Sequence, residues 1–139
     1  MRRTAGGGAR GLPAPLRALA VIRIGLLAGV LAFGAVAWLA HRQPGWEQPE
    51  SAVIVRVHRV VLMSWIAVSA ILIVLRLRLE RARDDAARRV TLIIAWAVSE
   101  AAALGGAVDF YLGGDASMFA GGLFVMAAAF ILFPLRRPG

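Results

Sequence analysis

Four long apolar segments, separated by three polar connections, constrain the fold of this chain more than any other feature of its sequence. A bilayer offers no water to backbone amides and carbonyls, so an apolar segment of this length crosses it as a helix. The sequence therefore predicts an all-α integral membrane protein, a bundle of four transmembrane helices that follows a flexible cytoplasmic tail at residues 1–15. Within the membrane domain at residues 16–139, we expect helices over about 16–40, 52–78, 88–108 and 118–135.

The arginines predict the orientation of the chain, because the cytoplasmic flanks of membrane helices carry the excess of basic residues. Thirteen arginines lie in the amino-terminal flank, the connection between the second and third helices, and the carboxyl end, and three lie elsewhere. Both termini are therefore expected in the cytoplasm, and the chain in the cytoplasmic (inner) membrane of a bacterium, as a multi-pass protein. These flanks account for the net charge of +8, so we expect contact with the lipid bilayer and predict no nucleic-acid partner.

The connection between the second and third helices is the most charged part of the chain. One interpretation is a solvated, salt-bridged extension of both helices, in which Glu80 pairs with Arg76 four residues earlier. The other interpretation is a docking site for an acidic partner. The candidates for partner or lipid contact are Arg76, Arg78, Arg81, Arg83, Arg88 and Arg89.

Glu100 is an intramembrane glutamate near the middle of the third apolar segment. An ionisable group at this depth is costly and by default marks a functional site. Arg23 is expected to direct its side chain toward the inner boundary of the membrane, so the sequence offers Glu100 no ion pair. Its candidate hydrogen-bond partners are Ser64, Ser69 and Ser99. Two interpretations stay open: the carboxyl binds and releases a proton, or it fixes helix packing, with a serine or with an arginine of another subunit.

Small residues predict the faces on which the helices pack. Gly25 and Gly29 form a small-xxx-small pattern on the first helix, and Gly106 lies on a face of small residues on the third. Such faces let two helix backbones approach closely. Such faces pack helices within one chain at least as often as they bind a second copy. The pattern is therefore compatible with packing within this chain and with a homo-oligomer.

The remaining polar residues give no pattern of a catalytic site. His41 and His58 are expected at similar depth, which is compatible with ligation of a haem or with two solvated imidazoles near the interface, and we favour the second. The chain has no cysteine and no phosphate-binding loop. No nucleophile, base and orienting group fall at one depth. We predict no enzyme activity, no cofactor and no metal site.

Two short stretches resemble the c subunit of rotary ATP synthases. Residues 97–101 (Ala-Val-Ser-Glu-Ala), followed by Gly105 and Gly106, look like the proton-carrying helix of that family, and Arg42-Gln43-Pro44 looks like its polar-loop motif. The resemblance implies that Glu100 is a proton carrier, although here it lies on the third apolar segment and does not follow the Arg-Gln-Pro hairpin directly. The architecture is also similar to that of small four-helix multidrug transporters, whose single intramembrane glutamate lies on the first helix.

These observations favour a non-catalytic accessory or structural subunit of a larger membrane assembly, which contacts a membrane-protein partner or a second copy of itself. The alternative is a proton-coupled small transporter, or an ion-conducting subunit, that uses Glu100.

Overall fold

The computed structural model describes residues 14–82 and 84–135, and these residues form four helices with no strand. The helices are α1 (Ala14–His41), α2 (Ser51–Arg81), α3 (Asp85–Gly113) and α4 (Ala116–Leu132). The helices α1, α2 and α3 are long and apolar enough to cross a membrane, whereas α4 is a shorter apolar helix of 17 residues. The prediction of an all-helical fold with four helices is confirmed. Most of the tail expected at residues 1–15 lies outside the described residues.

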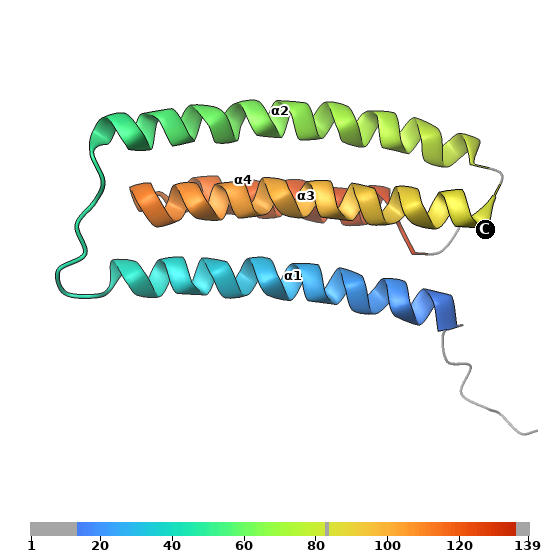
Figure 1. The fold of residues 1–139 in the computed structure, drawn as a ribbon, viewed down its shortest axis with the longest axis horizontal. Coiled ribbons are helices and arrows are strands. Elements are labelled where there is room, and N and C mark those ends of the chain that lie inside the picture. The colour runs from blue at the N-terminus through green and yellow to red at the C-terminus, as the bar shows by residue number, and fades with distance from the viewer. Residues whose placement is uncertain (1–13, 83, 136–139) are drawn as a thin grey trace, which may run out of the picture.

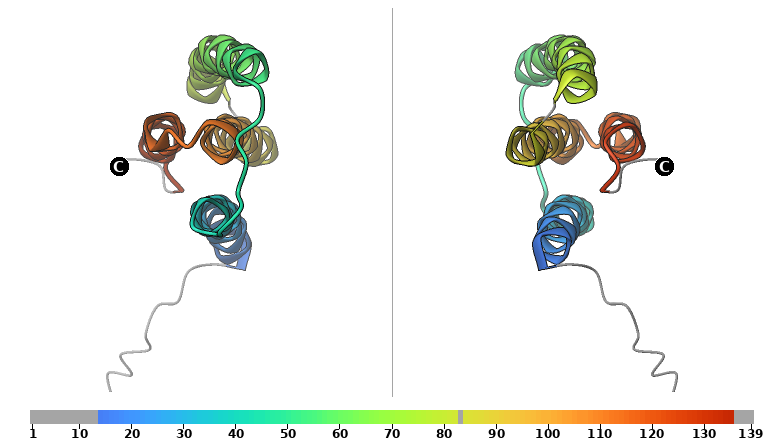
Figure 2. Two further views of the ribbon diagram at one scale, coloured as in Figure 1. Left: turned by 90° about the vertical axis from the view of Figure 1, so that its left-hand side faces the viewer. Right: turned by 90° about the vertical axis from the view of Figure 1, so that its right-hand side faces the viewer.

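Helix α3 is the centre of the fold. The four helices run side by side and reverse direction at each connection (Figure 1). An end-on view places α1 and α2 on opposite sides of α3, with α4 beside α3 on a third side (Figure 2). We call the end that holds the start of α1, the α2–α3 connection and the end of α4 the arginine end. The opposite end, with His41 and His58, is the histidine end.

The connection between α3 and α4 is shorter than expected. The sequence predicts a polar connection from about residue 109 to 117, but α3 continues to Gly113 and α4 begins at Ala116. Gly114 ends α3 with a positive φ of 76°, a backbone conformation that glycine adopts without a steric penalty, and its amide donates to the Phe110 carbonyl. Asp115 then caps α4 by accepting from the Ser117 amide at 2.9 Å.

The charged connection at the arginine end is mostly helical. Helix α2 continues to Arg81 and α3 starts at Asp85, with Asp84 capping α3 by accepting from two backbone amides of its first turn. Within α2, Arg76 Nε lies 3.1 Å from Glu80 Oε1, four residues further along. The predicted ion pair is therefore present. Both helices extend into this region, as the interpretation of a salt-bridged helical extension predicts.

Two glycines let α3 and α4 approach closely. A Cβ on Gly106 would overlap the Met118 carbonyl oxygen and lie 3.0 Å from its carbonyl carbon. A Cβ on Gly122 would lie 2.8 Å from the Ala103 Cα. In both cases the neighbouring atoms belong to the backbone of the other helix, so they cannot move aside as a side chain would. Only glycine fits at these two positions, and they fix how α4 packs on α3.

The carboxyl end of α4 is held by side chains from the other three helices. Pro134 has no amide hydrogen, so the Phe130 carbonyl lacks its normal donor four residues further along. The Arg23 guanidinium donates to this carbonyl at 3.2 Å and lies 4.2 Å from the centre of the Phe130 ring. Arg76 donates to the Leu132 carbonyl, and the Trp96 indole to the Phe133 carbonyl. Arg23 therefore points across the fold to the last turn of α4, at the arginine end. The sequence did not predict this contact.

We expect Arg23→Met to destabilise the fold by about 1–2 kcal/mol, because the Phe130 carbonyl loses its donor. Pro134→Ala supplies an amide hydrogen, and extension of α4 past its present end at Leu132 would bring this amide to the Phe130 carbonyl. Arg23→Met should then cost less in that background, by about 1 kcal/mol. The measurement is a double-mutant cycle of unfolding free energy in detergent micelles. Arg17→Met, an exposed arginine on the same helix, is the control. Equal costs of Arg23→Met in both backgrounds would show that Arg23 does not replace the missing amide.

Candidate functional site

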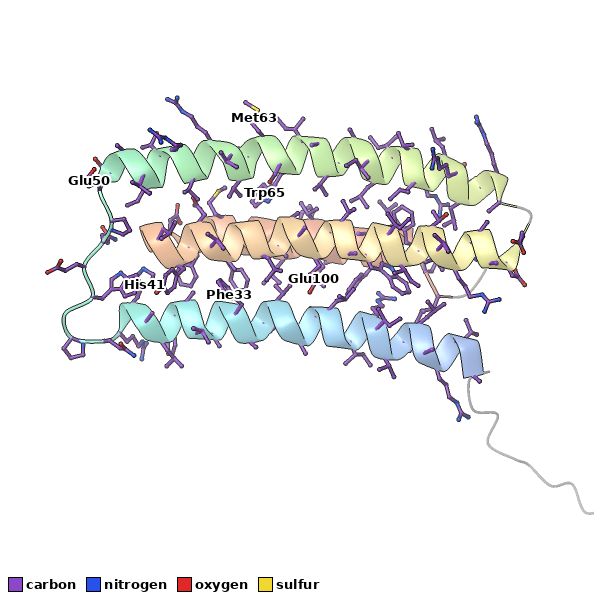
Figure 3. All side chains as sticks on the ribbon, viewed as in Figure 1. Phe33, His41, Glu50, Met63, Trp65 and Glu100 are labelled. Carbon is purple, nitrogen blue, oxygen red and sulfur yellow. The ribbon has the colours of Figure 1, made fainter. Side chains whose placement is uncertain are left out.

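Glu100 projects from α3 toward α1, about midway along both helices (Figure 3). Its side chain is half-buried, and its Oε1 lies 3.8 Å from the point that a Cβ would occupy on Gly29. No residue of the described chain forms a hydrogen bond or an ion pair with this carboxyl. Because Gly29 has no side chain, α1 leaves room for the carboxyl without supplying a donor.

The structure does not bring the three candidate serines together with Glu100. The Ser99 hydroxyl donates to the Trp96 carbonyl at 2.8 Å, and the Ser64 hydroxyl donates to the Val61 carbonyl at 2.7 Å. Both bonds stay within one helix, a common use of serine in apolar helices. Ser69 is exposed on α2, which lies on the opposite side of α3 from α1 (Figure 2).

The predicted packing glycines differ in what they contact. Gly106 lies in the close contact between α3 and α4 described above. A Cβ on Gly25 would meet open space, and one on Gly29 would meet only Glu100. No backbone of another described helix therefore packs on the small-xxx-small pattern of α1, and Gly29 leaves room only for the Glu100 carboxyl. The glycine that α1 does use is Gly34, where a Cβ would overlap the Phe119 ring of α4.

The candidate arginines at the arginine end have separate roles in the structure. Arg76 is occupied by Glu80 and by the Leu132 carbonyl. Arg89 donates from Nε to the Asp85 carbonyl within the first turn of α3. Arg78 and Arg81 are exposed on the last turns of α2, Arg88 is half-buried on α3, and Arg83 lies outside the described residues.

The histidine end holds a buried carboxylate. Asp109 of α3 is only 3% exposed, and its Oδ2 lies 3.2 Å from Nδ1 of His58 on α2. Its other oxygen, Oδ1, has no partner among the described residues. Asp109 falls within the polar connection predicted at about residues 109–117, and its pairing with His58, 51 positions away in the sequence, was not predicted. A lone acidic residue at the end of an apolar segment is the only sequence signal that could have pointed to it.

The other histidine lies in an aromatic cluster on a different side of α3. His41 Nδ1 donates to the Ala37 carbonyl at 2.8 Å, and its ring stacks on Phe110 with a centroid distance of 5.4 Å. Trp46 packs against both His41 and Tyr111. The two histidines therefore face different partners and do not form a facing pair of the kind that ligates a haem. Within the described residues, no group of three or more histidine and acidic side chains could hold a metal ion.

Asp115, near the histidine end, combines helix capping with an electrostatic effect. Its hydrogen bonds from the Ser117 amide and hydroxyl, together with the nearby His58, hold the pKa of this carboxyl below its usual range. Its contribution to stability is therefore present above the ordinary pKa of an aspartate and is lost as the pH falls through its lowered value.

The residues that resemble the polar loop of c subunits form the turn after α1. The amides of Arg42 and Gln43 donate to the last carbonyls of α1, and the Arg42 guanidinium lies 3.7 Å from the centre of the Trp38 ring. Comparison of the whole chain with protein families, curated proteins and solved structures finds no match.

Proposed function

We propose that the protein is a non-catalytic accessory or structural subunit of a larger membrane assembly, in the cytoplasmic membrane of a bacterium, with both termini on the cytoplasmic side. The observation that supports this is the half-buried carboxyl of Glu100, which has no partner among the described residues. A carboxyl at mid-membrane depth needs a hydrogen-bond donor or a cation. In the proposed assembly, a helix of a neighbouring subunit supplies it.

The surface around Glu100 suits the approach of another helix. Ala97 and Ala101 of α3 are exposed next to it, and Gly25 on α1 has open space beyond it. Small residues let a second helix come close enough for its side chains to reach the carboxyl. We propose a different membrane protein as the neighbour, because a symmetric contact between two copies at this surface would place two carboxyls together.

Site-specific photo-crosslinking in native membranes tests this proposal. A photoreactive residue at position 101 should give a discrete adduct with another protein, and Glu100→Leu should weaken that adduct. The control position is Met63, which projects from the side of α2 that faces away from α3 (Figure 3). A folded monomer that gives no adduct from position 101 and purifies alone in mild detergent would contradict the proposal.

The second candidate function is proton-coupled transport or ion conduction through Glu100. The absence of a side chain on Gly29 favours it, because the carboxyl can bind and release a proton without displacing a neighbour. Proton flux into vesicles that contain only this protein is the measurement, with Glu100→Gln as the variant. Flux that depends on Glu100 would establish transport and contradict the accessory role, whereas equal and near-zero flux would eliminate the transport candidate.

A further inference from the structure

A groove opens between the last turns of α2 and the first turns of α3, at the arginine end. Its volume is about 450 Å³. The residues that carry the argument are Leu75, Arg78, Arg81, Val90, Thr91 and Ile94. The groove is distinct from the Glu100 surface, since Ile94 and Glu100 are on different turns of α3 and the groove is formed with α2, whereas Glu100 faces α1.

The groove changes from basic to apolar along the helix axes. Arg78 and Arg81 are three residues apart near the end of α2, so their side chains emerge on the same side of the helix. Neither has a hydrogen bond or an ion pair with a described residue, in contrast to Arg76, which is occupied by Glu80. Deeper along the helices, Leu75 and Ile94 present only hydrocarbon.

The apolar part of the groove continues along α2. A second hollow of about 330 Å³ shares Leu75 and Arg78 with the first and extends to Ala70. From Arg78 to Ala70 the helix rises about 12 Å, which is the length of a large part of an acyl chain. The two hollows therefore provide an apolar surface on both sides of Leu75. The guanidinium groups of Arg78 and Arg81 lie next to this surface, toward the arginine end.

The acidic residues near the groove do not cancel the positive charge of its arginines. Asp84 is occupied in capping α3, where it accepts from the Ala86 and Ala87 amides. Asp85 occupies the first turn of α3, and Arg88 and Arg89 lie three and four residues after it on the same helix. Arginine pairs with phosphate in bidentate fashion, and basic residues between membrane helices attract anionic headgroups.

We infer that this groove binds an anionic phospholipid. Arg78 and Arg81 bind its phosphate, and its two acyl chains lie on either side of Leu75, one against Val90 and Ile94 and the other toward Ala70. A hollow at the histidine end, which contains Arg56 and Arg59, is lined by α2 alone. The hollow that extends to Ala70 is also lined by α2 alone, but it shares Leu75 and Arg78 with the groove, which α2 and α3 line together.

Native mass spectrometry of the full chain in detergent tests the inference. Phosphatidylglycerol and phosphatidylcholine with identical acyl chains are the probes. Wild-type protein should bind phosphatidylglycerol at least tenfold more tightly than phosphatidylcholine. The double variant Arg78→Gln/Arg81→Gln should lose about thirtyfold in affinity for phosphatidylglycerol, since each basic residue near a membrane surface contributes about fivefold.

The double variant Arg56→Gln/Arg59→Gln is the matched control and should keep the wild-type preference. An equal loss in both double variants would show a general surface attraction and overturn the inference, as would equal binding of the two lipids by wild type. Inorganic phosphate is the probe for the headgroup alone. If phosphate alone binds the site as tightly as phosphatidylglycerol does, the acyl chains contribute nothing and the groove is not a lipid site. Circular dichroism of each variant checks that the helices are retained.

Discussion

Gly106→Ala is expected to destabilise the protein by about 3 kcal/mol or more. The new Cβ would overlap the Met118 carbonyl oxygen, and the Phe119 Cα would lie 3.3 Å away. Both neighbours are backbone atoms of α4, so relief requires the whole helix to move away from α3. That movement would also separate Gly122 from Ala103 and reduce packing along the entire contact.

Gly105→Ala is the matched control, because the substituted residue is the adjacent one on the same helix. Its Cβ would lie 3.7 Å from a Val61 side-chain carbon, an ordinary contact. Since alanine favours helix over glycine by up to about 1 kcal/mol, Gly105→Ala should be neutral or stabilising. Unfolding free energies in mixed micelles give the comparison. Similar stabilities of the two variants would mean that α3 and α4 are not in this close contact.

His58→Leu is expected to cost about 2–3 kcal/mol, because it leaves the Asp109 carboxylate buried with no partner. The reverse change, Asp109→Leu, should cost less, since the His58 side chain is 43% exposed and water can hydrogen-bond to it. In the double variant both polar groups are gone, and leucines of similar size can pack between α2 and α3. The double variant should therefore be more stable than His58→Leu alone.

The double-mutant cycle of unfolding free energies measures this coupling, which we expect at about 1–3 kcal/mol. Arg59→Leu changes an exposed neighbour on α2 and controls for the added hydrocarbon. Additive costs for the His58 and Asp109 variants would mean that their hydrogen bond contributes nothing to the attachment of α2 to α3.

Asp109 also shows why the sequence underestimated α3. An aspartate followed by aromatic residues and glycines is typical of a polar connection, so the predicted helix ended at residue 108. In the structure, the carboxyl is paired with His58, and this pairing offsets the cost of burial and lets the helix continue to Gly113. The partner lies on another helix, so no local pattern in the sequence could identify it.

For Glu100, too, the sequence predicted the position of the residue but not its contacts. Its place near the middle of the third helix could be read from the sequence, because apolar length and helix rise are local quantities. Its surroundings could not. The predicted serines use their hydroxyls within their own helices, and the carboxyl faces Gly29 on α1. Which face of α3 meets α1 depends on the packing of all four helices.

The sequence by itself determined the number of helices, their approximate positions and the concentration of arginine at one end, because each depends on short stretches of chain. Only the tertiary structure decided which glycines are in contact, what Arg23 binds and which carboxyls have partners. Gly25 and Gly106 look alike in the sequence, yet one faces open space and the other a backbone carbonyl. The physical reason is that packing and hydrogen bonding between helices depend on their relative rotation and spacing, which are set by the assembled fold.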